Sequence, residues 1–193
     1  DRLHINDYIH RLEKTDATTW QLPPGGKPAV FISETMQRGL KTEPQVAIYQ
    51  AIIPQLPADT FVIPQQVTVT AVLTNDLQRL QYKLGKTTAD DFYHRLGEAF
   101  VLNRETIAQK LTQHGPENSL FPPCTLTLSN DIPAENTLLE LHTDIAIGHG
   151  HFLLHEESPL TMPLKLARFD NGLPAAIRFQ YEMGETPGIR YDL

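Results

Sequence analysis

The sequence contains very little cysteine. Cys124 is the only cysteine among 193 residues, so no disulfide can form within the chain, and no zinc or iron–sulfur site can be built from several cysteines. A chain of this length can bury a core of its own without such cross-links. We therefore expect a globular fold that packing alone holds together.

Positive charge is also scarce, and long apolar runs are absent. The chain has 16 Lys and Arg against 23 Asp and Glu, a net charge of −7. This balance argues against binding to nucleic acid through a broad basic surface and against electrostatic binding to an anionic membrane. No apolar run approaches the roughly 18 residues of a membrane-spanning helix, and no signal peptide is visible. We expect a soluble protein, whose compartment the sequence leaves open.

The pattern of apolar residues predicts a single α+β domain over residues 1–193. Residues 67–74 are rich in β-branched side chains and predict a strand. Residues from about 75 to 115 predict helices packed on a mostly antiparallel sheet, and residues from about 120 to 185 predict a C-terminal meander with period-two alternation. The three expected helices carry apolar stripes on one face, formed by Leu77, Leu80 and Leu84, by Phe92, Leu96 and Phe100, and by Ile107 and Leu111. We expect Asn75 or Asp76 to cap the first of these helices and Asn103 to cap the third.

One stretch, LHTDIAIGHGHFLLHEE at 141–157, holds four of the eight histidines. Because glycine accepts the positive φ of a tight hairpin turn, we place the turn at His149 and Gly150. The resulting register sets Gly148 opposite His151 and brings four polar side chains to one face of the hairpin. These are His142, Asp144, His155 and Glu157.

Imidazole and carboxylate groups in such a patch are ligands for zinc or iron. The sequence therefore offers a metal site at these four positions, with His149 and His151 as auxiliary residues and Zn or Fe as the ion. Asp144 beside His155 could instead orient an imidazole for acid–base chemistry. A solvated polar sheet face is the third interpretation, and a three-residue turn would shift the register and disperse the group.

Two short stretches resemble known families. His149, His151 and Glu156 resemble the H-x-H…E metal-ligand order of the cupins, although Thr143 and Pro163 stand where that family has glycines. The segment from Arg95 to Leu111 resembles the helix-turn-helix of bacterial regulators, and the resemblance implies that Arg104 to Leu111 forms a DNA-reading helix. Balanced charges in this segment make phosphate attraction weak.

Among these alternatives we expect a non-catalytic domain that binds a ligand or another protein and forms part of a larger protein. The chain has no phosphate-binding loop and no nucleophile elbow to suggest otherwise. A metal-dependent enzyme or metal-binding protein is the second hypothesis, and a transcriptional regulator is the third. On the first hypothesis no cofactor is required. The sequence identifies neither the partner nor the oligomeric state.

Overall fold

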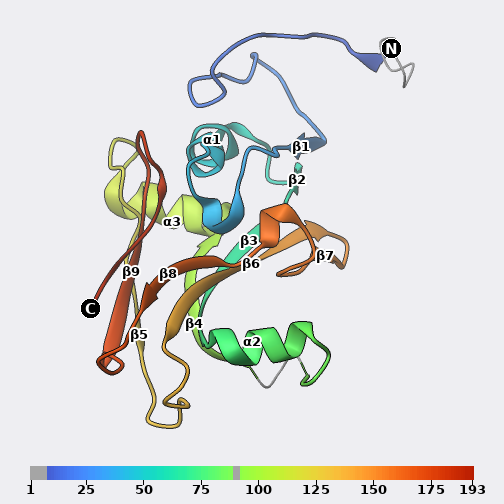
Figure 1. Ribbon diagram of the computed structural model, residues 1–193. Helices are drawn as coiled ribbons and strands as arrows, with labels where there is room; N and C mark the ends of the chain where they lie inside the picture. Colours follow the sequence, from blue (N-terminus) through green and yellow to red (C-terminus); the bar gives the residue numbers. More distant parts are fainter. Residues whose placement is uncertain (1–7, 89–91) are drawn as a thin grey trace.

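The computed structural model describes residues 8–88 and 92–193. At the centre of this part of the chain is a five-stranded antiparallel sheet (Figure 1). Four strands follow the order β4-β3-β6-β7, and β8 pairs with the first half of β6. Their bounds are β3 Gln66–Thr74, β4 Tyr93–Leu102, β6 Leu138–Gly148, β7 His151–Leu153 and β8 Leu164–Arg168.

A smaller antiparallel sheet has the order β10-β9-β5 and consists of β5 Cys124–Thr127, β9 Ala176–Glu182 and β10 Gly188–Asp192. It meets the large sheet where β5 lies against β4, and there the Cys124 thiol donates to the Glu98 carbonyl at 3.3 Å. Gly97 permits this approach, because a Cβ at its position would lie 3.0 Å from Cδ2 of Leu126. Two short strands, β1 Val30–Ile32 and β2 Phe61–Ile63, form a separate parallel pair.

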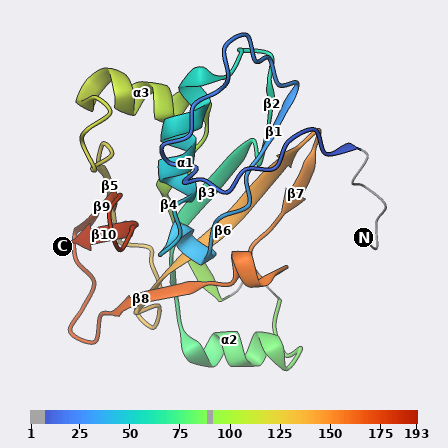
Figure 2. The ribbon, with the colours of Figure 1, turned by 90° about the horizontal axis from the view of Figure 1, so that it is seen from above.

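The helices lie at opposite ends of the sheets (Figures 1 and 2). At one end are α1 Gln45–Ile52 and α3 Arg104–His114, and at the other is α2 Asp76–Lys83. The side chains of Asn75 and Asn103 cap α2 and α3 by accepting hydrogen bonds from backbone amides, as the sequence predicts. Short 3-10 helices complete the set, namely η2 Arg38–Leu40, η3 Ile53–Gln55 and η5 Pro159–Thr161. Within the described residues no helix is long and apolar enough to cross a bilayer.

The expected α+β class is confirmed, but the expected all-helical middle is wrong. Residues 93–102 form the strand β4, paired with β3 along its length, where we expected a helix. Phe92, Leu96 and Phe100 are spaced by four residues, and this spacing fits one face of a strand as well as one face of a helix. Pairing with β3 decides between the two. This strand also removes the first helix of the expected helix-turn-helix.

Candidate functional site

Glu140, His142 and Asp144 project from one face of β6, because alternate residues of a strand share a face. This face is not solvated. Glu140 is fully buried and His142 is 3% exposed. A buried ionisable group is costly unless it is paired or hydrogen-bonded, so the partners of these side chains determine what the group can do.

Glu140 is paired with Arg79, which reaches it from α2. The guanidinium donates from Nη1 to Oε1 at 2.6 Å and from Nη2 to Oε2, a bidentate arrangement. Burial opposes ionisation of Glu140, but the contacts with His142 and Arg79 outweigh it and hold the pKa of the carboxyl below its ordinary value. The carboxylate is therefore charged at neutral pH.

His142 lies between this ion pair and a second histidine. Its Nε2 is 3.5 Å from Oε2 of Glu140, but no hydrogen bond of good geometry reaches that nitrogen within the described residues. The ring stacks on His155 with centroids 4.9 Å apart, and the Tyr93 ring meets both imidazoles edge-on. The 3.5 Å contact is thus an electrostatic one, and aromatic packing holds the ring in place.

His155 is held by Asp144. Oδ1 of Asp144 accepts from the backbone amide of His155 at 2.8 Å and lies 3.4 Å from Nδ1 of its ring. The Asp144 carboxylate raises the pKa of His155, and the contact with His155 lowers the pKa of Asp144. With about a third of its side chain exposed, His155 is the most exposed member of the group, followed by Asp144.

The structure brings three of the four predicted metal residues together and separates the fourth. The turn at His149 and Gly150 and the pairing of Gly148 with His151 are as expected, but an irregularity at Ile147 shifts the register beyond it by one residue. The Glu157 carboxylate accepts from the amide of Leu154 at 2.7 Å instead of joining the group. His149 stacks on Phe61, with centroids 4.6 Å apart.

The remaining contacts of these side chains favour an ion-pair network over a metal site. In residues 8–88 and 92–193, no group of three or more His, Cys, Asp or Glu side chains has an arrangement that could hold a metal ion. The metal role of His142, Asp144, His155 and Glu157 stays a prediction, which elemental analysis of the purified protein would test.

A second candidate region, the loop 33–45, was not anticipated from the sequence. Leu40 has φ 52° and Thr42 has φ 69°, values that cost free energy for residues other than glycine. Backbone strain of this kind persists only where the surroundings impose it, and it gathers at functional sites. The sequence carries no signal for the strain, because neither leucine nor threonine is typical of this conformation.

Three sets of contacts hold the loop in this conformation. The buried Gln45 side chain joins its two ends, since Oε1 accepts from the Thr35 amide at 3.0 Å and Nε2 donates to the Ser33 carbonyl at 3.1 Å. From β6, the Thr143 hydroxyl accepts from the Gly39 amide at 3.0 Å. From β9, the Tyr181 hydroxyl donates to the Leu40 carbonyl at 3.0 Å. The loop is therefore rigidly positioned on both sheets.

The loop carries a glutamate near each end. Glu34 is exposed, and Glu43 is half-buried and accepts from Nε2 of Gln37 at 3.0 Å. Glutamate carboxylates on a rigid backbone suit a planar cation, because a guanidinium can donate two parallel hydrogen bonds to a carboxylate. In this loop strain, anchoring and acidic side chains coincide.

The chain resembles solved structures of protein arginine methyltransferases. It matches a crystal structure of PRMT6 with a TM-score of 0.52 and 12% identity, over 86% of this chain and 67% of that one. It also aligns with a PRMT6-SAH structure (TM-score 0.48, 12% identity, 85% and 67%) and with the Trypanosoma brucei PRMT1 enzyme-prozyme heterotetrameric complex with AdoHcy (TM-score 0.43, 15% identity, 86% and 60%). No protein-family model and no curated protein sequence matches the chain.

This likeness corrects the functional expectation. The neighbours are arginine methyltransferases, which are enzymes, so the expected non-catalytic binding domain is wrong. The helix-turn-helix regulator is wrong as well, because residues 93–102 form the strand β4 in place of its first helix. The resemblance is one of fold, because the sequences share only 12% of residues. The alignment spans 67% of the PRMT6 chain and 60% of the Trypanosoma brucei PRMT1 chain.

Proposed function

We propose that this chain is part of a methyltransferase and that it binds the methyl acceptor, a guanidinium-type cation. The observation that carries the proposal is the likeness of its fold to PRMT6 over 86% of the chain. The rigid loop 33–45 supports the choice of acceptor, because its carboxylates would hold a guanidinium by charge-assisted hydrogen bonds. Glu34 and Glu43 are the residues to which we assign that contact.

The methyl donor that such enzymes use is S-adenosylmethionine, and the described residues fit it poorly. Nucleotide-type cofactors bind in open α/β folds at the carboxyl ends of parallel strands. Within residues 8–88 and 92–193 the only parallel pair is β1 with β2, and both are three residues long. We therefore assign acceptor binding, and not donor binding, to this part of the chain.

On this proposal the loop orients the acceptor before the methyl group arrives. A guanidinium nitrogen that receives a methyl group must lose a proton, and carboxylates beside it stabilise the positive charge during that change. Thr143 and Tyr181 anchor the backbone at Gly39 and Leu40, so the loop that carries the carboxylates needs little reorganisation. The strain at Leu40 and Thr42 would then be part of the positioning of these groups.

The test is methyl transfer by the complete protein from labelled S-adenosylmethionine to an arginine-rich peptide, with a lysine-rich peptide of equal charge as comparison. Since hydrogen bonds to charged groups are worth about 1.5–3 kcal/mol, Glu34→Gln and Glu43→Gln should each lower kcat/KM by roughly tenfold to a hundredfold. The exposed Glu185 provides the matched control, Glu185→Gln, which should leave kcat/KM unchanged. Absence of transfer to either peptide, or full activity of both loop variants, would overturn the proposal.

A further inference from the structure

One seam between the two sheets, the one between β8 and β10, is not closed by strand pairing. Following paired and contacting strands around the molecule gives β8, β6, β3, β4, β5, β9 and β10 in that order. Among the described strands, β8 pairs only with β6 and β10 pairs only with β9. Each therefore keeps one edge of backbone N–H and C=O groups without a strand partner. Such edges are sites where a further strand can add.

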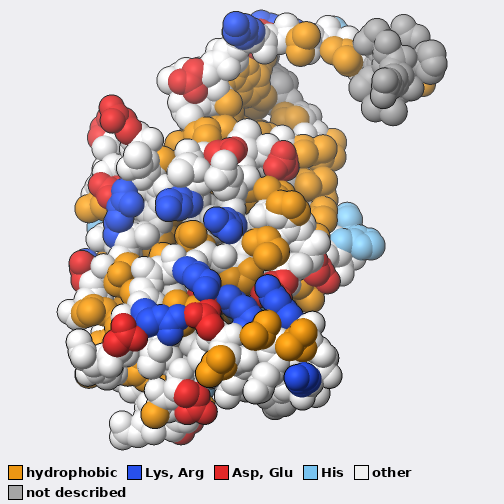
Figure 3. All heavy atoms as spheres, in the orientation of Figure 1, with side chains coloured by type: hydrophobic (Ala, Val, Ile, Leu, Met, Phe, Trp, Pro, Cys, Tyr) orange, Lys and Arg blue, Asp and Glu red, His pale blue; other side chains and the backbone are white. Residues whose placement is uncertain are grey.

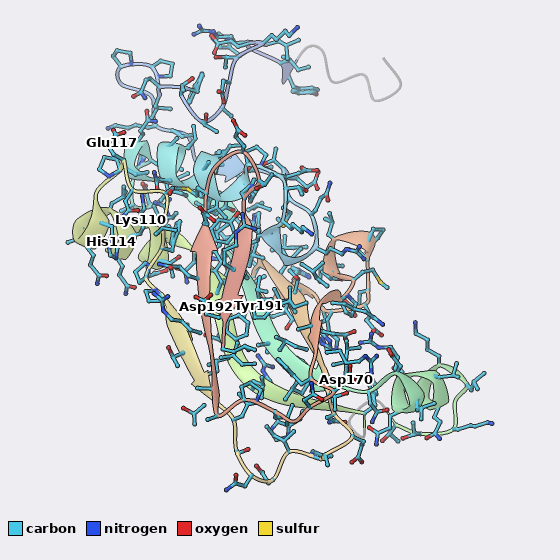
Figure 4. The ribbon with its side chains drawn as sticks, turned by 60° about the vertical axis from the view of Figure 1, so that its left-hand side comes forward. Lys110, His114, Glu117, Asp170, Tyr191 and Asp192 are labelled. Carbon is cyan, nitrogen blue, oxygen red and sulfur yellow. The ribbon has the colours of Figure 1, made fainter. Side chains whose placement is uncertain are left out.

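A cleft of about 470 Å³ lies between these two edges, a size within the roughly 300–1,000 Å³ of pockets that hold ligands. Leu164–Leu166 of β8 line one wall, and Gly188–Asp192 of β10 line the other. Lys41, in the rigid loop 33–45, closes one end, since its Cγ would lie 3.7 Å from a Cβ at Gly188. In Figure 4, Tyr191 and Asp192 lie between α3, which carries Lys110 and His114, and the turn at Asp170 beyond β8.

The side chains along the cleft alternate. Leu164, Leu166 and Tyr191 pack against the core, whereas Lys165, Arg190 and Asp192 are exposed. An added strand would therefore meet apolar side chains on its inner face, and two cations and one carboxylate on its outer face. Figure 3 shows Lys and Arg side chains gathered across the middle of this face, on a protein whose net charge is −7. The cations select an acidic partner.

We propose that this seam binds an extended acidic peptide of a partner protein, which adds as a strand between β8 and β10. Its apolar residues would alternate with Glu or Asp, so that the former face the core and the latter meet Lys41, Lys165 and Arg190. Two of these cations already have exposed acidic neighbours, Asp76 for Lys165 and Glu182 for Arg190. Such exposed pairs are weak and can exchange partners. Within residues 8–88 and 92–193 Lys41 forms no ion pair, and we therefore assign it as the anchor for an acidic residue of the partner.

The experiment uses the complete protein and three synthetic peptides of about seven residues. The first alternates valine and glutamate, the second alternates valine and lysine, and the third is the first with proline at its centre. Fluorescence anisotropy measures affinity, and hydrogen–deuterium exchange reports on 164–168 and 188–192. We expect the acidic peptide to bind at least about tenfold more tightly than either of the others, because proline cannot donate to a ladder. It should also slow exchange in both segments.

Lys41→Glu should weaken binding of the acidic peptide by roughly tenfold or more. Lys27→Glu, which makes the same charge change at an exposed residue that does not line the cleft, should not. Equal thermal stability of the two variants would show that lost binding is not lost folding. Equal affinity for the acidic and basic peptides would overturn the proposal, as would binding without slower exchange in β8 and β10, or no binding of the acidic peptide.

Discussion

The guanidinium of Arg79 on α2 forms a bidentate ion pair with the fully buried carboxylate of Glu140 on β6. The two residues are 61 positions apart, and no buried apolar side chain was found on α2. The ion pair is therefore a principal link between this helix and the sheet. The ion pair stabilises the fold only when both partners are present, because removing one leaves a buried charge without its partner.

Arg79→Ala should lower the free energy of unfolding by about 3–5 kcal/mol, since it leaves the Glu140 carboxylate buried and uncompensated. Urea denaturation measures the effect. The double variant Arg79→Met with Glu140→Leu should recover most of the loss, because it removes both charges and keeps apolar volume. An equal loss in the single and double variants would show that packing, and not the buried charge, is the main contribution.

Stability should depend on pH through the His155–Asp144 pair. The pKa of His155 is raised above 6.5 in the folded state, so its stabilising contribution is complete below about pH 6.5 and is lost as the pH rises through the raised pKa. The pKa of Asp144 is lowered below 3.8, so its contribution is present above that value and is lost as the pH falls through the lowered pKa. The pair is partly exposed, and we expect under about 1 kcal/mol from it.

Titration of the His155 ring by NMR checks this prediction directly. Asp144→Asn should bring the pKa of His155 back toward its ordinary value and flatten the pH dependence of thermal unfolding above pH 6.5. Asp59→Asn, at an exposed carboxylate, is the control and should change neither. A His155 titration that is identical in all three proteins would contradict the ion pair.

Gly148 and Gly150 offer a matched pair of substitutions at the hairpin turn. Both have positive φ, 135° and 80°, so alanine is strained at either position. A Cβ at Gly148 would also collide with Cζ of Phe61, whereas nothing lies within 4 Å of a Cβ at Gly150. We expect Gly148→Ala to cost about 1–3 kcal/mol more than Gly150→Ala, measured by urea denaturation. Equal losses of stability in the two variants would contradict the close contact between Phe61 and position 148.

The apolar stripe of α2 should contribute little to stability. Leu77, Leu80 and Leu84 are 76%, 54% and 59% exposed, so replacing any of them with serine should change the free energy of unfolding by no more than about 0.5 kcal/mol. Ile107→Ala on α3 is the contrast. This side chain is 1% exposed, and its loss should cost about 2–5 kcal/mol.

Local signals predicted several elements correctly. The β-branched run at 67–74 forms β3, the asparagine caps begin α2 and α3, and the alternating segments after residue 120 form strands. The turn at His149 and Gly150 also forms as glycine chemistry predicts. In each case the residues that determine the structure are neighbours in sequence, so a short stretch holds the whole signal.

Other features depend on residues that are distant in sequence. Residues 93–102 form a strand because β3 pairs with them. The polar face of β6 is buried because Arg79 comes from α2 to neutralise Glu140. The backbone of 33–45 holds its strained conformation because Thr143 and Tyr181 bind it.

The sequence by itself determined the α+β class, the caps, the hairpin turn and the near-meeting of Asp144 with His155, because each follows from local periodicity or from glycine and asparagine chemistry. Only the tertiary structure decided that the histidines enter an ion-pair network, that the leucines of α2 face solvent, and that a strained loop carries Glu34 and Glu43. The free energy for each of these comes from contacts between segments that no local pattern links.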